Sequence, residues 1–449
     1  MKVLLVLVLI SVSVFLFQDS ISSSSSWKIP IVVSATEQEE DEDETLYIIG
    51  DLHGDVECTK YWLDQIGLFT EDEGEKKRVW KNDKNKLLFM GDYIDKGPQS
   101  LPTVLLVKEL TEQFPNHVTA IMGNHELELL KDVDQTQKYG QWTSTGGKYY
   151  QLPTATVHPA EYLNFLSEEQ KDPMDNVVIE ALYNASLEVY GYGAYRSVTF
   201  GVVDDNHPKA KAGSSIIDYI TDSPMIQQIA KERLQVYQRA YTDAFQPTTE
   251  LGKWIQSLPI LHYSHNTLFL HGGISSEVAM LFKDVPKSID IINNALKSYT
   301  TSHDIRQFID KTQLGQIIYH LVTYRGNHPK ENQYYHTIDE NCDDLQNVLD
   351  RLKGVDRIAV GHTPDWNVRM HCQGKLLALD SLLGRWIRAI GNDYCPGDAT
   401  HTSSNGRYTC EKLSDHCEGQ IIKLTSNKNN GNVEVIHPSN IQPNQDNEL

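Results

Sequence analysis

Short apolar runs that end beside a metal-capable side chain recur five times in this chain. The first covers residues 46–49 and leads through a glycine into Asp51 and His53. A brief β-branched and aromatic run bounded by glycine is typical of a buried strand. Because open α/β sheets place their sites at the carboxyl ends of strands, we expect Asp51 and His53 at such an edge. A carboxylate paired with an imidazole suits zinc, iron or manganese.

The other four recurrences have the same arrangement and place an acid, an amide or a histidine after the run. They are residues 86–90 before Asp92, residues 117–122 before Asn124 and His125, residues 267–270 before His271, and residues 357–360 before His362. One such coincidence carries little weight, because many loops contain Asp and His. Five of them predict strands that deliver their side chains to one shared metal site.

Helical patterns alternate with these runs in the N-terminal part of the chain. They cover residues 57–66, 101–114 and 126–131. This β-α-β-α-β order predicts an α/β fold with parallel strands. Residues 132–259 form a long spacer with helical stretches at 159–170 and 223–245. Because a structureless loop of this length is implausible, we predict a helical insertion beside the site.

The C-terminal part continues the mixed pattern. Residues 288–320 are mostly helical, and residues 375–380 resemble a strand that ends at Asp380. Two further runs, 420–424 and 432–436, flank Asn/Gly-rich turn residues and predict a terminal hairpin. We therefore place one domain at residues 45–437.

The termini differ in composition from this domain. Residues 1–20 contain a lysine and then an apolar run, which predicts a secretory signal peptide; an uncleaved anchor is the alternative. Residues 21–44 are Ser-rich and then acidic, which predicts a disordered lead-in, and residues 438–449 form a polar tail. No later stretch is apolar enough to span a membrane, so we expect no span in the mature chain.

The net charge indicates which partners are unfavourable, and the cysteine content indicates the cellular compartment. The formal net charge is −21 without a basic stripe, which argues against a nucleic-acid partner. Six cysteines favour the secretory pathway, with the protein secreted or retained in the ER or vesicular lumen. We expect disulfides among the five cysteines of the last quarter, with open connectivity, and an inert, buried thiol at Cys58. Asn184 begins a glycosylation sequon.

The metal-capable residues suggest a division of roles between two metal ions. Asp92 would bridge the ions, with Asp51 and His53 on one side and Asn124, His271 and His362 on the other. Such a pair can clamp a phosphoryl group and activate a water.

Four further side chains suit the remaining chemistry. His125 follows a ligand and is the natural general acid for the leaving oxygen, and Asp95 could orient it. Arg325 is the first candidate to bind phosphate oxygens and Lys96 the second, because an arginine can bind them bidentately. Arg385 is a weaker third candidate, better interpreted as a structural ion pair.

The ordered motifs Asp-x-His-Gly, Gly-Asp-x-x-Asp, Gly-Asn-His-Glu, His-Gly-Gly and Gly-His-Thr resemble the calcineurin-like metallophosphoesterase superfamily. Within it they are most similar to the phosphoprotein phosphatase branch and its bacterial-type, Shewanella-like members. The resemblance implies a β-sandwich flanked by helices, two metal ions (Mn, Fe or Zn) and hydrolysis of phosphomonoesters. The substrate would be a phosphoprotein, at Ser/Thr or Tyr, or a phosphorylated small molecule.

Two positions refine this resemblance. Lys96 stands where the family usually has arginine, which would weaken phosphate binding or mark a different substrate. No second histidine follows His362 two residues later, which disfavours the purple acid phosphatase and nuclease branches. A dinucleoside polyphosphate hydrolase and a non-catalytic binding module are the alternative functions. Histidines outside the motifs are interpreted as surface or core residues: His262, His265, His328, His336 and His371.

Overall fold

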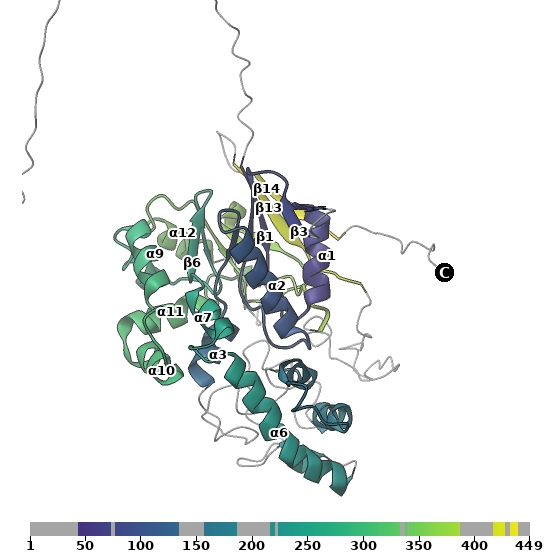
Figure 1. The fold of residues 1–449 in the computed structure, drawn as a ribbon. Coiled ribbons are helices and arrows are strands. Elements are labelled where there is room, and N and C mark those ends of the chain that lie inside the picture. The colour runs from purple at the N-terminus through teal and green to yellow at the C-terminus, as the bar shows by residue number, and fades with distance from the viewer. Residues whose placement is uncertain are drawn as a thin grey trace, which may run out of the picture. The chain divides into compact units, whose positions relative to one another are not determined.

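Two five-stranded sheets form the centre of the protein in a computed structural model (Figure 1). The structure describes residues 44–72, 77–133, 157–185, 216–220, 223–332, 337–339, 341–386, 416–426 and 432–438. All of them lie in the unit Asp43–Leu449. The predicted signal peptide, nearly all of the lead-in and of the tail, and the residues Cys395, Cys410 and His336 lie outside this described part.

The first sheet has the order β14-β13-β1-β4-β5. Its strands are β1 (Thr45–Ile49), β4 (Asn85–Phe89), β5 (Val118–Ala120), β13 (Ile421–Thr425) and β14 (Asn432–Ile436). The first three run parallel, whereas β13 pairs antiparallel with β1 and β14 pairs antiparallel with β13. The predictions of parallel N-terminal strands and of a terminal hairpin are therefore confirmed.

The second sheet has the order β11-β12-β10-β7-β6. Its strands are β6 (Leu261–Ser264), β7 (Thr267–Leu270), β10 (Arg357–Val360), β11 (Arg369–His371) and β12 (Leu376–Ala378). Strands β7, β10 and β12 run parallel, and β6 and β11 are antiparallel additions at the two edges. Each sheet thus contains three neighbouring parallel strands whose carboxyl ends share one edge.

Alternation along the strands explains how the sheets are buried on both faces. Leu46 and Ile48 of β1 share a buried cluster with Phe269 of β7 and Ala359 of β10, so this cluster joins the two sheets. Ile49, from the same strand, belongs instead to the larger cluster that includes side chains of the helices. Successive strand side chains point to opposite faces, so a strand covered on both sides must be apolar throughout. The mixed α/β sandwich that was predicted is confirmed.

Helices cover the outer faces of the sheets. In Figure 1, α1 and α2 lie beside β1, whereas α9, α11 and α12 lie on the side of β6. The helices of the described part outside the spacer 132–259 are α1 (Val56–Ile66), α2 (Ser100–Gln113), α3 (Asn124–Asp132), α8 (Ser276–Ala279), α9 (Val285–Asn294), α10 (Ser302–Lys311), α11 (Gln313–Thr323) and α12 (Cys342–Leu349). Thr301 and Thr312 cap α10 and α11 with their hydroxyls, which divides the predicted helical stretch 288–320 into separate helices.

The described part of the spacer is helical, with one prediction corrected. α6 (Pro224–Ala244) matches the predicted stretch and is capped by Ser223, and α7 (Glu250–Ser257) follows it. Residues 159–170 were predicted as a helix, but only a 3₁₀ segment, η2 (Pro159–Phe165), forms, and the chain turns extended at Leu166. Tertiary contacts hold η2 in place, since it packs against α2 and α6 and Tyr162 stacks on Tyr237.

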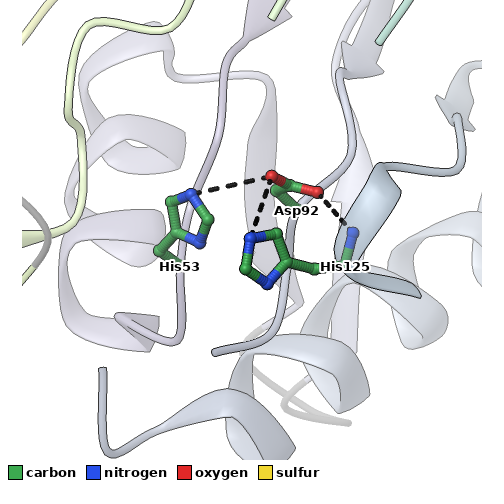
Figure 2. A group of neighbouring side chains, drawn as sticks. All are labelled: His53, Asp92 and His125. Carbon is green, nitrogen blue, oxygen red and sulfur yellow. Dashed lines mark hydrogen bonds and ion pairs between the residues drawn. The ribbon is translucent and has the colours of Figure 1, made fainter. Parts of the chain in front are cut away.

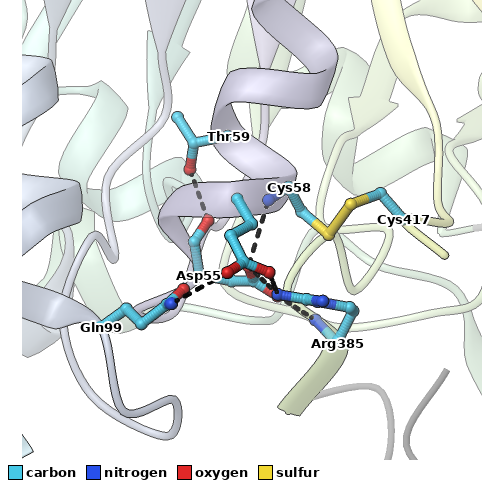
Figure 3. The surroundings of a disulfide bond; sticks show 7 residues. Asp55, Cys58, Thr59, Gln99, Arg385 and Cys417 are labelled. Carbon is cyan, nitrogen blue, oxygen red and sulfur yellow. Dashed lines mark hydrogen bonds and ion pairs between the residues drawn. A yellow bond between two sulfur atoms is a disulfide. The ribbon is translucent and has the colours of Figure 1, made fainter. Parts of the chain in front are cut away.

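Two disulfides connect the described residues. Cys342 pairs with Cys372, as expected for the C-terminal cysteines. The prediction of an inert thiol at Cys58 was wrong, because this buried residue pairs with Cys417 across a sequence separation of 359. Figure 3 shows this bond at the first turn of α1. No helix in the described part is both long and apolar enough to cross a bilayer.

Candidate metal centre

The parallel strands of both sheets deliver polar side chains to one place. Asp51 and His53 follow β1, Asp92 follows β4, and Asn124 follows β5. From the second sheet, His271 follows β7 and His362 follows β10. The structure therefore brings together all six predicted ligands from loops that are far apart in the sequence. Their roles as ligands stay predictions.

Asp92 lies at the centre of this group. Its Oδ1 is 3.2 Å from His271 Nε2. Its Oδ2 is 3.7 Å from His53 Nε2 and 3.8 Å from His125 Nε2 (Figure 2). Two sets of ligand atoms lie within 4.8 Å of one another, His53 with Asp92 and His125, and Asp92 with His271 and His362. Because Asp92 belongs to both sets, its two oxygens are placed as a bridging carboxylate requires.

Asp51 and Asn124 complete the donor set. Asn124 Oδ1 lies 3.1 Å from His271 Nε2, and Asp51 Oδ2 accepts a 3.0 Å hydrogen bond from the backbone N–H of His362. The other oxygen of Asp51 is buried and has no hydrogen-bond partner in the described part of the chain. A buried carboxylate oxygen without a donor is costly unless a cation binds it, so the residues fit a metal site.

The electrostatics of the site also fit bound cations. Burial raises the pKa of Asp51 well above its usual value, and the nearby carboxylate of Asp380 adds to this effect. Burial would also raise the pKa of Asp92, but His271 and the other histidines outweigh it and hold the pKa well below its usual range. Burial lowers the pKa of His53 to about 3, which leaves a neutral imidazole, the form that binds metals.

The backbone around the ligands is held in unusual conformations. His53, Asp92 and His362 have φ angles of 45°, 53° and 63°, in the left-handed region that non-glycine residues rarely adopt. A Cβ at Gly123 would clash with Asp92 Oδ1, and one at Gly361 would clash with Asp51 Oδ1. Strain of this kind persists where the surrounding structure imposes it, and it clusters at functional sites.

Glu126 organises these loops. Its carboxylate accepts hydrogen bonds from the backbone N–H groups of Asp92 (3.0 Å), Tyr93 (2.8 Å) and Gly123 (2.9 Å). Burial raises its pKa to about 8, with the charge of Asp92 as the next cause. Since both oxygens accept hydrogen bonds from the backbone, Glu126 supports the loops that carry Asp92 and Asn124.

A chain of hydrogen bonds leads from His125 into the protein. Its Nδ1 lies 2.5 Å from Asp95 Oδ2, and the backbone N–H of Asp95 donates to Ser100 Oγ at 2.9 Å. Ser100 and Leu101, at the start of α2, donate their backbone N–H groups to Glu161 at 2.6 and 2.8 Å. The sequence did not indicate Glu161, which comes from η2 in the spacer.

Arg325 and Lys96, the two predicted phosphate-binding residues, both interact electrostatically with predicted metal ligands. Burial lowers the pKa of Arg325, and the charges of Asp380, Asp51 and Asp92 act on it, which places its guanidinium near the centre. Lys96 is buried, and its charge lowers the pKa of His53.

Arg385 has a different role, as expected. It forms a bidentate ion pair with the Asp55 carboxylate at 2.9 and 3.0 Å (Figure 3). It also contacts Glu57. Asp55 in turn accepts a hydrogen bond from the Cys58 N–H and caps α1. Arg385 therefore anchors the helix that follows the first motif.

The sequence motifs did not indicate Asp380, whose charge acts on Asp51 at the site. It follows β12, which runs parallel to β10, so it reaches the same edge of the sheet as His362. Burial raises its pKa to about 6. The strand-like run before it was the available signal, but no glycine stands beside Asp380 to match the recurring pattern.

Comparison with known proteins agrees with this geometry. Residues 45–192 match the family model described as calcineurin-like phosphoesterase. The serine/threonine-protein phosphatase 4 catalytic subunit of Eremothecium gossypii is 32% identical over 102 residues, covering 23% of this chain and 27% of that protein. The serine/threonine-protein phosphatase 6 catalytic subunit of Caenorhabditis elegans is 34% identical over 102 residues, covering 23% of this chain and 25% of that protein.

The chain thus spans about a quarter of the length of these curated relatives. The crystal structure of a cold-active protein-tyrosine phosphatase from a psychrophilic Shewanella species aligns with a TM-score of 0.44 and 17% identity, covering 85% of this chain and 76% of that one. Residues 45–192 therefore match a calcineurin-like phosphoesterase domain. Over about 100 residues, the chain is also similar to phosphoprotein phosphatase catalytic subunits.

Proposed function

We propose that this protein hydrolyses phosphomonoesters, with phosphoproteins as its substrates. The observation that carries the proposal is the position of Asp92, which belongs to both sets of ligand atoms and lies beside His125. Phosphoprotein phosphatase homologues support the substrate class.

Two ions of manganese, iron or zinc would occupy the centre. Asp51, His53 and Asp92 would hold one ion, and Asp92, Asn124, His271 and His362 the other. Bound there, the ions would polarise the phosphoryl oxygens and activate a water for in-line attack on phosphorus.

The side chains of this protein supply the remaining steps. Arg325 would hold the phosphate oxygens through its planar guanidinium, with Lys96 as a second positive charge. His125 would donate a proton from Nε2 to the leaving oxygen, while the buried carboxylate of Asp95 holds its Nδ1. This hydrogen bond fixes the orientation of the imidazole, so Nε2 is the nitrogen that faces the centre.

His125→Asn tests whether His125 is the general acid. The test is needed because His125 Nε2 lies near Asp92 and could instead bind a metal ion. We expect kcat on a phosphopeptide to fall by roughly 10²- to 10⁴-fold while metal content stays unchanged. The Mn-loaded protein would be assayed with phosphotyrosine and phosphoserine/threonine peptides, p-nitrophenyl phosphate and a dinucleoside polyphosphate. Loss of metal in the variant would make His125 a ligand instead. Turnover of the dinucleotide alone would favour the small-molecule alternative, and no turnover with metal bound would favour a binding module.

We also propose that the protein resides in the secretory pathway, either secreted or retained in a lumen. The disulfides Cys58–Cys417 and Cys342–Cys372 support an oxidising compartment. Asn184, the sequon asparagine, is exposed and could be glycosylated. Expression of the full chain in a eukaryotic host should yield a protein whose mass falls on glycosidase treatment, and Asn184→Gln should abolish this shift. A cytosolic, unmodified product with reduced cysteines would contradict the proposal.

A further inference from the structure

Two segments that carry arginines contact the loop of His362 and Thr363. The Nε2 of His362 lies 3.1 Å from the carbonyl oxygen of Thr323, two residues before Arg325. Arg369, at the start of β11, donates through Nη2 to the carbonyl oxygen of Thr363 at 3.1 Å. Both arginines are therefore tied to residues next to a predicted metal ligand.

Further contacts hold these two segments together. The Asn341 side chain donates to the Gly326 carbonyl oxygen at 2.8 Å, and the next residue, Cys342, is bonded to Cys372 directly after β11. Arg369 lies opposite Ala378 in the antiparallel pair of β11 and β12, which places it at the carboxyl edge of the sheet. The turn at residues 324–328 and the start of β11 are thus fixed on the same side of the centre.

This region contains buried polar groups without partners. His328 is 6% exposed, and neither of its ring nitrogens has a hydrogen-bond partner among the described residues. Within that part of the chain, the same holds for Arg369 Nε and Thr363 Oγ1. Since unsatisfied buried donors are costly and rare, their concentration here favours a site at which a ligand accepts hydrogen bonds.

The charge of the region selects an anion. Arg325 and Arg369 carry two positive charges. Among the described residues, Arg369 forms an ion pair with the partly exposed Asp365, 3.3 Å from its Nη1, and the carboxylates of Asp380, Asp51 and Asp92 act on Arg325 from the ligand cluster. Burial lowers the pKa of His328 to about 3, and the charges of Arg369 and Arg325 add to this, so His328 is a neutral donor. Arginine N–H, imidazole N–H and a hydroxyl are the groups that recognise phosphate or carboxylate oxygens.

We propose that Arg369, His328 and Thr363 form a second anion-binding site, which holds another phosphate or carboxylate of the substrate while Arg325 holds the phosphate that is hydrolysed. This inference rests on the proposed function and adds a substrate class to it. The preferred substrates would be peptides with an acidic or phosphorylated residue near the reacting phosphate.

Three phosphopeptides that differ at one residue next to the phosphorylated position test the site. That residue would be glutamine, glutamate or a second phosphorylated residue. We expect the KM of the wild-type protein to be roughly tenfold lower for the two doubly anionic peptides than for the glutamine peptide. Arg369→Gln should reduce the ratio of the KM for the glutamine peptide to the KM for the other two peptides to less than about twofold. Its effect on kcat/KM for p-nitrophenyl phosphate should be smaller than its effect on kcat/KM for those two peptides. Arg78→Gln, which breaks an exposed ion pair with Glu109, is the matched control and should keep the ratio.

A uniform loss on all substrates in Arg369→Gln would overturn the proposal, because Arg369 would then only shape the loop before β11. An unchanged ratio would overturn it as well. If Arg369→Gln fails to fold, His328→Asn alone must lower the ratio of the KM for the glutamine peptide to the KM for the other two peptides. Equilibrium binding of the same peptides to the Mn-loaded His125→Asn protein needs no turnover. If this variant binds the peptides with a second anionic residue more tightly than the glutamine peptide, but the wild-type protein hydrolyses none of them, the proposed phosphatase activity is refuted. The proposed anion-binding site is then retained.

Discussion

The two sides of the candidate centre are built differently. On the proton-donor side, defined here as His125, Asp95, Ser100 and Glu161, each residue is hydrogen-bonded to the next. On the phosphate side, defined as Arg325, His328, Thr363 and Arg369, buried donors lack partners. The first arrangement positions a group that must not move during reaction, whereas the second keeps donors available for a ligand.

Asp92 lies between the two sides, so its loss should have the largest effect. Asp92→Asn keeps the shape of the side chain but removes the charge shared by both sets of ligands. We expect metal content to fall and activity to drop by at least about 10³-fold, because the loss removes several kcal/mol of transition-state stabilisation. Metal analysis and phosphopeptide assays measure both effects, with the exposed Asp83→Asn as control. Full metal content with near wild-type activity would show that Asp92 does not join the two sides.

Arg325→Lys examines the phosphate side alone. Lysine keeps the charge but loses the planar fork, so we expect KM to rise by roughly tenfold with a smaller change in kcat. The companion variant Arg385→Lys should lower thermal stability and leave KM unchanged, because Arg385 pairs with Asp55 and Glu57. Steady-state kinetics and thermal melts of both variants separate the two roles. A larger KM effect in Arg385→Lys would reverse the assignment.

Variants of Glu161 test whether this residue helps to position the proton donor through Ser100 and Asp95. Glu161→Ala removes the acceptor for the first N–H groups of α2, which loosens Ser100 and, through it, Asp95. We expect kcat to fall by roughly tenfold with KM unchanged, since a small misplacement of the acid slows the chemical step. Glu161→Gln retains one acceptor oxygen and should lose less. Equal kinetics in all three proteins, at equal stability, would show that η2 does not position the acid.

The anchoring of η2 should also depend on pH. Burial lowers the pKa of His158, which caps η2, to about 3. The unfolded chain therefore binds this proton more readily, and stability is lost as the pH falls from about 6.5 towards 3. Protonation of His158 alone would lower the free energy of unfolding by up to about 1.4 kcal/mol per pH unit in this range.

His158→Gln cannot gain that charge, so its free energy of unfolding should fall less steeply on acidification. Denaturant titrations of the metal-loaded protein at several pH values between 4 and 7 give the two slopes. Parallel slopes would mean that His158 is solvated or protonated in the folded protein.

Local patterns were sufficient for the strands and the ligands. Residues 46–49 and 87–90 are apolar because both faces of their strands are buried, and this property is visible without knowing the neighbours. Asp92 and His362 could be identified because each directly follows such a strand, and parallel strands end at one edge of a sheet. The sequence by itself therefore determined the sandwich and indicated the six candidate ligands.

Only the tertiary structure decided what surrounds them. Glu161 reaches Ser100 across 61 residues, and Cys58 pairs with Cys417 across 359, and neither distance leaves a periodic trace in the sequence. His328 was interpreted as a surface or core residue, and no motif indicated Arg369. In the folded protein the charges of Arg369 and Arg325 act on His328. The physical reason is that strand periodicity reflects burial of a whole face, whereas a cap, a disulfide or an anion site depends on which single side chains meet in space.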